Sequence, residues 1–384
     1  MLFKTPDLIE VENGVLAKID DLRRTLGYAM STSRKWTGLL RRNTFAKAIQ
    51  GSNTIEGYNV TDDDAIAIVE DQEPLDAEAE AWAAVKGYRN ALTYILQLAD
   101  DPHFAYSADL FRALHYMMLH YDPTKNPGRW RPGPIAVRND QKGEIVYEGP
   151  PAEDVPGLIG ELVKSLSHVD LGLPSLVRAA MGHLNLAMIH PFKDGNGRMA
   201  RCLQTLVLAR EGILAKDFCS IEEYLGRNTP EYYAVLGSVG GGRWHPERDA
   251  RPWIRFCLKA HFFQATTLLR RTREMERLWE ILEREIQAKG LPERAIVALS
   301  DGAMGYRVRN STYRASAGDV SENLASRDLK LTVEAGLLVA HGERRGRFYV
   351  GSPYLRALRE RTREPRKIED PFQPQDPQLP GMSV

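Results

Sequence analysis

The string HPFKDGNGRMAR, residues 190–201, brings together side chains that could transfer a phosphate-containing group. His190 is a candidate general base, because an imidazole titrates near neutral pH. Asp194 offers hard oxygen ligands, which suit an Mg²⁺ ion that also contacts phosphate oxygens. Arg198 and Arg201 are three residues apart, so on a helix they share a face that can bind phosphates. Phosphoryl-type transfer depends chiefly on positioning and charge neutralisation, which this set can supply.

The chain is helical on both sides of this string and interrupted within it. Pro191 ends the first helix, because its ring and missing N–H are not tolerated inside a helix. Gly195, Asn196 and Gly197 suit a tight turn and precede a helix N-terminus, where free N–H groups and the helix dipole favour anions. Apolar residues then recur at helical spacing until Gly212. The sequence therefore predicts two core helices joined by an anion-binding loop.

Each part of the string also has an ordinary structural explanation. A histidine before a proline is usually a helix end, DGNG is usually a turn, and two arginines are usually a solvated face. Their order within one string is what favours chemistry. His183 lies seven residues before His190 and could suggest a metal site, but no carboxylate follows at a metal-site spacing. We therefore expect His183 to be a supporting core histidine.

The bulk properties exclude several classes of function. A chain of 384 residues can form two or three domains. Lys plus Arg and Asp plus Glu both total 51, so net charge predicts no general attraction to nucleic acid or membranes. The three cysteines lack CxxC spacing, which argues against disulfides and thiolate metal sites and fits a reducing cytoplasm. Neither a signal-peptide pattern nor a membrane-length apolar run is present.

The pattern is helical from Val11 to about Gly51, where SNTIEGYNVT interrupts it. SADLFRALHYMML predicts a further helix, with Ser107 as its candidate cap.

The remaining pattern predicts a mainly helical protein with two strand-containing regions. The apolar runs 135–137 and 145–147 flank a polar turn, which predicts a β-hairpin. A long charged helix follows from Pro252 to Lys289. After it, the order helix, helix, helix, strand, strand resembles a winged helix-turn-helix, with 320–335 as recognition helix and 337–350 as wing. The last twenty residues contain five prolines and predict a mostly disordered tail.

The 190–201 string resembles the Fic-family signature, HxFx[D/E]GNxxxxR, at every defining position. The resemblance extends over residues 107–260: the hairpin is similar to the Fic flap, and EEYLGRNTPEYYAVL resembles the nucleotide-side helix. It implies a mainly α fold, with a Fic-type helical core, a β-hairpin flap and a small C-terminal winged helix-turn-helix domain. The expected divisions are an N-terminal helical region (1–104), the Fic core (105–260), a linking helix (261–290), the winged-helix-like domain (291–352) and a Pro-rich tail (353–384).

The resemblance also implies an activity, transfer of AMP from ATP to a Ser, Thr or Tyr hydroxyl of a target protein. His190 would deprotonate the acceptor hydroxyl and Asp194 would hold Mg²⁺. Phosphate contacts would come from the loop and both arginines, with Arg201 at the γ-phosphate: Gly195, Asn196, Gly197, Arg198 and Arg201. Tyr232 and Tyr233 are candidate adenine contacts, although the segment after them is longer and more basic than in many Fic proteins. Phe192 would anchor the loop.

Residues 52–57, SNTIEG, match a second family element, the [S/T]xxxE[G/N] inhibitory motif. The resemblance implies that Glu56 pairs with Arg201 and that Ser52 supports the helix. A carboxylate on Arg201 would compete with the γ-phosphate for one bidentate clamp and favour a non-productive nucleotide pose. As a bare string, SNTIEG could equally be a helix end.

Two other functions stay open. A DNA-binding regulator with a nucleotide-sensing core would use basic residues of the C-terminal module: Arg307, Arg309, Arg314, Arg327 and Lys330. Acidic residues dilute that surface, which favours a protein-interaction or dimerisation role, such as a homodimer, over DNA binding: Asp319, Glu322, Asp328 and Glu334. The same loop could also remove AMP or transfer another phosphate-containing group.

Overall fold

The computed structural model describes residues 1–31, 36–138, 144–168, 172–213, 220–343 and 346–373. The described residues are mainly helical, as predicted, and their strands form two-stranded antiparallel sheets. Short 3₁₀ helices join some of the longer elements: η1 (Leu98–Asp100), η2 (Pro123–Lys125), η3 (Ala152–Asp154) and η4 (Glu293–Ala295). Within these ranges, no helix combines the length and the apolar composition that a membrane span requires.

Two buried helices, α7 (Ser175–Ile189) and α8 (Asn196–Arg210), form the centre of the molecule and pack against each other. Their apolar residues lie in the main core, so both ends of the loop that joins them are held in place. Other helices surround this pair: α4 (Ala79–Gln97), α5 (Ala108–Leu119), α6 (Val155–Ser167) and α11 (Arg251–Lys289). Ser107 caps α5, as the sequence predicts, by accepting a hydrogen bond from the Leu110 N–H (3.0 Å).

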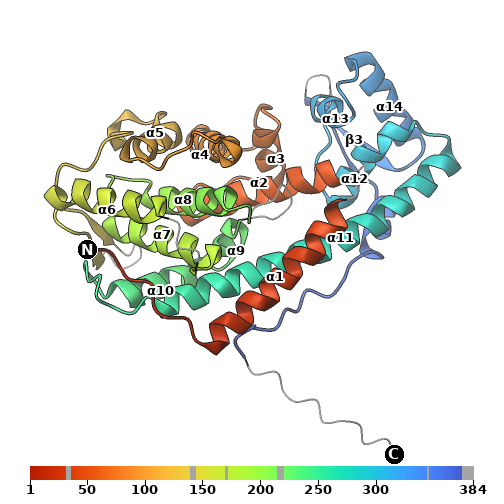
Figure 1. Cartoon of the computed structure of the whole chain (residues 1–384). Coiled ribbons are helices and arrows are strands. Elements are labelled where there is room, and N and C mark those ends of the chain that lie inside the picture. Colours follow the sequence, from red (N-terminus) through yellow and green to blue (C-terminus); the bar gives the residue numbers. More distant parts are fainter. Residues whose placement is uncertain (32–35, 139–143, 169–171, 214–219, 344–345, 374–384) are drawn as a thin grey trace, which may run out of the picture.

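The predicted long charged helix is α11, which connects the central helices to the C-terminal part of the chain (Figure 1). The N-terminal helix α1 (Glu10–Ser31) packs along it. Helix α2 (Thr37–Ile55) lies between the central helices and the C-terminal part of the chain (Figure 1). It packs against α3 (Asp62–Val69) and α9 (Glu222–Arg227). A Cβ on Gly226 would lie 2.6 Å from the Cα of Gly51, so α2 and α9 meet backbone to backbone and need glycine there.

Helix α2 continues further than the sequence pattern predicts. We expected an interruption from residue 52, but the helix runs to Ile55 and carries the SNTIEG segment on its last turns. It ends in a Schellman motif: Gly57 has φ +85°, its N–H donates to Thr54 O (3.0 Å), and the Tyr58 N–H donates to Asn53 O (3.1 Å). The polar residues that suggested a break are tolerated because α2 is held by tertiary packing.

The predicted β-hairpin consists of β1 (Ala136–Arg138) and β2 (Ile145–Glu148), and we call it the flap. Its turn, residues 139–143, lies outside the described residues. The flap is fixed to the central helices because the Tyr147 hydroxyl donates to Met188 O (2.7 Å). The outer edge of β2 is also engaged: the Glu148 N–H donates to Gly242 O (2.9 Å), just after α10 (Thr229–Gly240).

Residues 291–360, the C-terminal unit, contain three helices and a β-hairpin in the predicted order, followed by a further helix: α12 (Ile296–Met304), α13 (Asn310–Ser316), α14 (Glu322–Glu334), β3 (Leu338–His341), β4 (Phe348–Gly351) and α15 (Pro353–Glu360). Val308 also bridges to Tyr349 of β4. The expected tail therefore begins with a helix, whose Leu355 and Leu358 are buried. The sequence feature that indicates this helix is its cap, Ser352, which accepts a hydrogen bond from the Leu355 N–H (3.2 Å) and precedes a proline at the first helical position.

The C-terminal unit is joined to α2 and α3 through charged contacts. Arg42 of α2 donates to Glu70 (2.8 Å) and Ser316 (3.1 Å) and forms an ion pair with Asp301. Arg307 pairs with Asp76 at 2.8 Å. These contacts tie the helix that carries SNTIEG to a unit far away in the sequence.

The same contacts weaken the case for DNA binding. Besides Arg307, Arg309 donates to Glu73 O (2.9 Å) and Arg314 donates to Val320 O (2.9 Å). On α14, Lys330 pairs with Glu334 at 3.6 Å. Four of the five basic residues considered for phosphate contacts are thus engaged within the chain.

Candidate active site

The loop between α7 and α8 is held in a tight turn by its own side chains. The Asn196 amide donates to Phe192 O (2.9 Å), and its oxygen accepts from the Phe192 N–H (2.9 Å). Gly195 has φ +75°, and a Cβ there would lie 2.7 Å from a methyl carbon of Leu119. The Asn196 side chain therefore closes the loop and is not left for a phosphate, so only the backbone N–H of this residue could serve that expected role.

Phe192 anchors the loop, as expected. It is fully buried, and its ring stacks on His115 with the ring centroids 3.7 Å apart and an interplanar angle of 3°. His115 was not predicted from the sequence. Its Nδ1 accepts from the Gly128 N–H (2.8 Å), so its Nε2–H donates to Asp194 O (2.9 Å). Burial lowers the pKa of His115 to about 4, which keeps it neutral while it positions the backbone of Asp194.

His190 ends α7 with φ +51°, an uncommon conformation for a residue other than glycine. Its Nδ1 lies 3.1 Å from Ala187 O, so the proton is assigned to Nδ1 and the lone pair to Nε2. Burial lowers the pKa of His190 below its ordinary value, and the positive charge of Arg131 adds to this effect. At neutral pH the ring is therefore a neutral base.

Arg131 holds the flap and the loop together and was also not predicted. Its guanidinium donates to His190 O (2.8 Å), Gly133 O (2.7 Å) and Pro150 O (2.5 Å), and its backbone N–H donates to Pro191 O (2.9 Å). These carbonyls belong to the loop and to both ends of the flap. The acceptors are uncharged and the side chain is buried, so burial lowers the pKa of Arg131.

Asp194 is surrounded by positive charge. Lys125 Nζ lies 3.0 Å from its Oδ2, and Arg198 Nη2 lies 4.0 Å from the same oxygen. Its Oδ1 accepts from the Gly195 N–H (2.6 Å). Burial raises the pKa of Asp194, but the hydrogen bond from Lys125 and the charge of Arg198 outweigh it, so the pKa is lowered overall. The carboxylate is therefore charged and suited to a hard cation.

The described residues contain no group of three or more His, Cys, Asp and Glu side chains that could hold a metal ion. An Mg²⁺ ion at Asp194 would take one protein carboxylate and complete its shell with phosphate and water oxygens. That is a common pattern for magnesium, because this ion gives up its water reluctantly. The donor chemistry of the loop therefore fits an ion that arrives with a phosphate-containing substrate.

Arg198 lies in the first turn of α8 and is fully buried. None of its three guanidinium nitrogens has a hydrogen-bond partner among the residues that the structure describes. A buried guanidinium without hydrogen bonds costs free energy, because it loses its hydration, and the Asp194 carboxylate at 4.0 Å compensates only part of that loss. Nearby are the N–H groups at the start of α8, which have no acceptor within the helix. The Arg198 guanidinium and these N–H groups together could therefore bind an anion.

Arg201 lies one turn later, and its Nε and Nη2 are bound by the SNTIEG segment, while its Nη1 has no hydrogen-bond partner among the described residues. Its Nη2 donates to Glu56 Oε1 (2.5 Å) and Ser52 O (3.0 Å), and its Nε donates to Ser52 Oγ (2.8 Å). The ion pair with Glu56 thus exists as expected, and Ser52 binds Arg201 directly in addition to lying in the helix. The charge of Glu56 raises the pKa of Arg201 against the effect of burial. The absence of a side chain at Gly197 leaves space for the Glu56 carboxylate, because a Cβ there would lie 2.5 Å from Glu56 Oε1.

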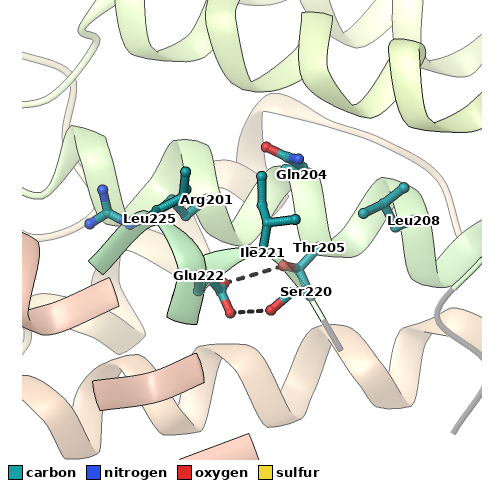
Figure 2. Close-up of a pocket in the computed structure, with 8 residues that line it drawn as sticks. All are labelled: Arg201, Gln204, Thr205, Leu208, Ser220, Ile221, Glu222 and Leu225. Carbon is teal, nitrogen blue, oxygen red and sulfur yellow. Dashed lines mark hydrogen bonds between the residues drawn. The ribbon is translucent and has the colours of Figure 1, made fainter. Parts of the chain in front are cut away.

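A small cavity lies behind Arg201, between α8 and the segment that leads into α9 (Figure 2). The Glu222 carboxyl reaches into it and accepts hydrogen bonds from Ser220 (2.5 Å), Tyr88 (2.6 Å) and Thr205 (3.2 Å). Burial raises the pKa of Glu222. The polar groups here satisfy one another, so we assign this cavity a supporting role behind the arginine.

The two tyrosines considered for adenine differ in position. Tyr232 is buried, and its hydroxyl lies 3.0 Å from His183 Nε2. His183 also contacts Gln204 through Nδ1 (2.6 Å), which confirms it as a supporting core histidine. Tyr232 therefore belongs to this network, and its ring is enclosed by the core, which argues against the expected adenine contact. Tyr233 is 48% exposed and its hydroxyl donates to Ile55 O (3.3 Å), so it stays a candidate.

The comparisons with known proteins agree with this site. Residues 105–208 match the Fic/DOC family. The chain is 27% identical over 256 residues to "Protein adenylyltransferase Fic" from Nematostella vectensis, covering 66% of this chain and 55% of that protein. It is 26% identical over 264 residues to "Protein adenylyltransferase fic-1" from Caenorhabditis elegans, covering 66% and 47%. The chain thus spans about half the length of these curated relatives.

Solved structures show the same fold. A Fic family protein from Desulfovibrio desulfuricans G20 aligns with a TM-score of 0.57 at 21% identity, covering 91% of this chain and 98% of that one. Fic-1 from C. elegans, residues 134–508, aligns with a TM-score of 0.52 at 24% identity, covering 67% and 72%. The loop geometry, the family match and the shared fold agree, and the chain therefore contains a Fic/DOC family domain at residues 105–208.

Proposed function

We propose that this chain is an autoinhibited protein adenylyltransferase, which transfers AMP from ATP to a Ser, Thr or Tyr hydroxyl of a target protein. The observation that carries the proposal is the convergence at one loop of a neutral base, a charged carboxylate and a buried arginine whose guanidinium nitrogens make no hydrogen bond to the described residues: His190, Asp194 and Arg198. The curated relatives are named protein adenylyltransferases, which supports the same reaction.

In this mechanism, His190 Nε2 takes the proton of the acceptor hydroxyl as its oxygen attacks the α-phosphorus, and pyrophosphate leaves. Arg131 fixes the base, because it holds the His190 carbonyl. Arg198 and the N-terminus of α8 bind the phosphate oxygens. An Mg²⁺ ion held by Asp194 would neutralise phosphate charge when ATP is bound. Arg201 would bind the γ-phosphate once Glu56 has left it.

Asp194→Asn is expected to weaken metal binding in the nucleotide complex, because it removes the only charged oxygen donor of the loop while keeping its size. The effect should be at least the ~10-fold in metal affinity that loss of a supporting group near a metal typically costs. A titration of Mg²⁺ against the transfer rate measures it. If the variant needs no more Mg²⁺ than the unchanged chain, Asp194 is not the metal ligand.

The flap is expected to bind its target by strand addition, and the pairing pattern supports the choice of one edge for this role. The Gly149 N–H donates to Ile135 O, so residues 135 and 137 face β2 and the N–H of Ala136 points away from it. The outer edge of β2 is engaged with Gly242. An extended acceptor segment would therefore pair with β1.

Ala136→Pro should consequently reduce labelling of proteins in a lysate by roughly two- to tenfold, the value of one hydrogen bond of ~0.5–1.5 kcal/mol. A proline is tolerated on a strand edge, so the hairpin should persist. Ala136→Val keeps the N–H and serves as the control. Both should be made in a Glu56→Gly background, and the affinity for ATP should be measured alongside. Equal losses of labelling and ATP affinity would indicate that the flap only covers the core.

A further inference from the structure

The inhibitory segment does not end at Glu56 in this structure. Tyr58, two residues later, is fixed to the end of α2 by the Schellman motif. Its hydroxyl accepts a hydrogen bond from Lys125 Nζ (2.6 Å), and its ring lies 5.1 Å from the Arg198 guanidinium carbon. Lys125 Nζ in turn lies 3.0 Å from Asp194 Oδ2. One short segment thus reaches the groups expected to bind the phosphates and the metal.

We propose that Tyr58 and Lys125 form a second inhibitory contact, in which Lys125 occupies the Asp194 carboxylate and competes with Mg²⁺ for it. The inference rests on the proposed function and extends the inhibitory segment from Glu56 to Tyr58. Glu56 would then block the γ-phosphate side of the site, while Lys125 blocks its metal side. Release of α2 and binding of metal would be coupled through Tyr58.

The position of Lys125 supports competition. It follows Asp122, which accepts from the Thr124 N–H (3.0 Å) and so caps the short helix η2, and Asn126 after it has φ +52°. The backbone of Lys125 is therefore fixed, while its long side chain is positioned by contacts to Tyr58, Asp194 and Asp122, whose Oδ2 lies 3.8 Å from Nζ. The ammonium can leave Asp194 by rotation of this side chain once the Tyr58 contact is lost. The Tyr58 hydroxyl holds the ammonium at Asp194, and a divalent cation could not share that oxygen with it without strong repulsion.

The position of Tyr58 explains why the contact would depend on the inhibitory helix. Its ring shields Arg198, and its hydroxyl restrains Lys125, so a shift of the end of α2 would affect both groups together. A ligand that binds only the shifted state favours that state in proportion to its differential affinity. Mg²⁺ and α2 would therefore oppose each other, and each would weaken the other's hold.

The test is a titration of the full chain with Mn²⁺ in saturating ADP, followed by electron paramagnetic resonance of the free ion. Lys125→Met removes the charge, and Tyr58→Phe removes only the hydroxyl. Both should tighten Mn²⁺ binding roughly two- to tenfold, the range of a partly exposed ion pair with a hydrogen bond. The double variant should match Lys125→Met, because Tyr58 acts through the lysine.

Lys193→Met is the matched control. Lys193 precedes Asp194 in the sequence, but its Nζ donates to Thr124 O (2.9 Å), so its loss changes net charge equally without freeing the carboxylate. Its Mn²⁺ affinity should change less than that of Lys125→Met. Unchanged or weaker Mn²⁺ binding by Lys125→Met would overturn the proposal, and a loss of ADP affinity in that variant would make Lys125 a phosphate ligand instead.

Asp194→Asn separates this inference from the proposed function. If Asp194→Asn weakens Mn²⁺ binding but Lys125→Met does not strengthen it, only the second inhibitory contact is wrong. If Asp194→Asn leaves Mn²⁺ binding unchanged, the metal site of the proposed function is itself misplaced, and the competition has no basis.

Discussion

Replacing His190 by alanine is expected to slow AMP transfer by about 10²- to 10⁴-fold, the usual cost of losing a general base. The reason is geometric. The Nδ1–H of His190 donates to Ala187 O, so Nε2 carries the lone pair that can accept a proton. Binding of ATP should persist, because Arg198 and the start of α8 are unchanged. The measurement is the single-turnover rate with labelled ATP in a Glu56→Gly background, together with ATP affinity.

His120→Ala is a matched control for this variant. His120 also ends a helix, and its Nδ1 lies 3.1 Å from the carbonyl of Met117, three residues earlier, as His190 does with Ala187. Its loss therefore reproduces the loss of the local hydrogen bond without removing the base. A rate for His190→Ala close to that of His120→Ala would contradict the assignment.

The pH dependence gives a second check. A general base must be deprotonated, so the rate falls as the pH drops through the pKa of His190. Burial lowers that pKa, with a further contribution from Arg131. The acid limb of the rate profile should therefore lie below the ordinary histidine value of about 6.5. If the acid limb of the rate profile disappears in His190→Ala, the group that titrates there is His190.

The sequence predicted those features that depend on neighbouring residues. The helix–loop–helix around 190–201, the cap at Ser107 and the flap strands to within a residue all follow from local rules of spacing and turn chemistry. The role of Phe192 as a buried anchor was predicted from the same string, through its resemblance to the family signature. In each case the signal and the structure lie within one short segment.

The residues that sequence analysis missed act between segments distant in the chain. Arg131 and Lys125 lie about 60–70 residues before the groups that they contact, and nothing in their own neighbourhood distinguishes them from solvated surface charges. Tyr232 and Tyr233 are adjacent, so spacing alone could not decide which faces the core. The end of α2 was placed too early, because its polar residues lower helix propensity while packing on α9 supports it.

Glu56→Gly is expected to raise the transfer rate by roughly ten- to a hundredfold, because it removes one charge-assisted contact of ~1.5–3 kcal/mol that holds Arg201 away from ATP. Glu56 is the C-cap of α2, and its backbone conformation is one that glycine adopts without strain, so the helix should end at the same place. Glu56→Gln should give a smaller gain, since it removes the charge but keeps a hydrogen-bond acceptor for Arg201.

The gain should require Arg201, and the double variant with Arg201→Ala tests this. Arg201→Ala alone leaves the Glu56 carboxylate and Ser52 without their partner, so it should lower the melting temperature, and part of that loss should be recovered in the double variant. Auto-modification with labelled ATP should be compared in all four proteins. If Glu56→Gly is no faster than the unchanged chain, Glu56 only ends a helix. If the double variant stays as fast as Glu56→Gly, the γ-phosphate is bound elsewhere, and Arg198, whose guanidinium makes no hydrogen bond to the described residues in the inhibited state, becomes the group to test next.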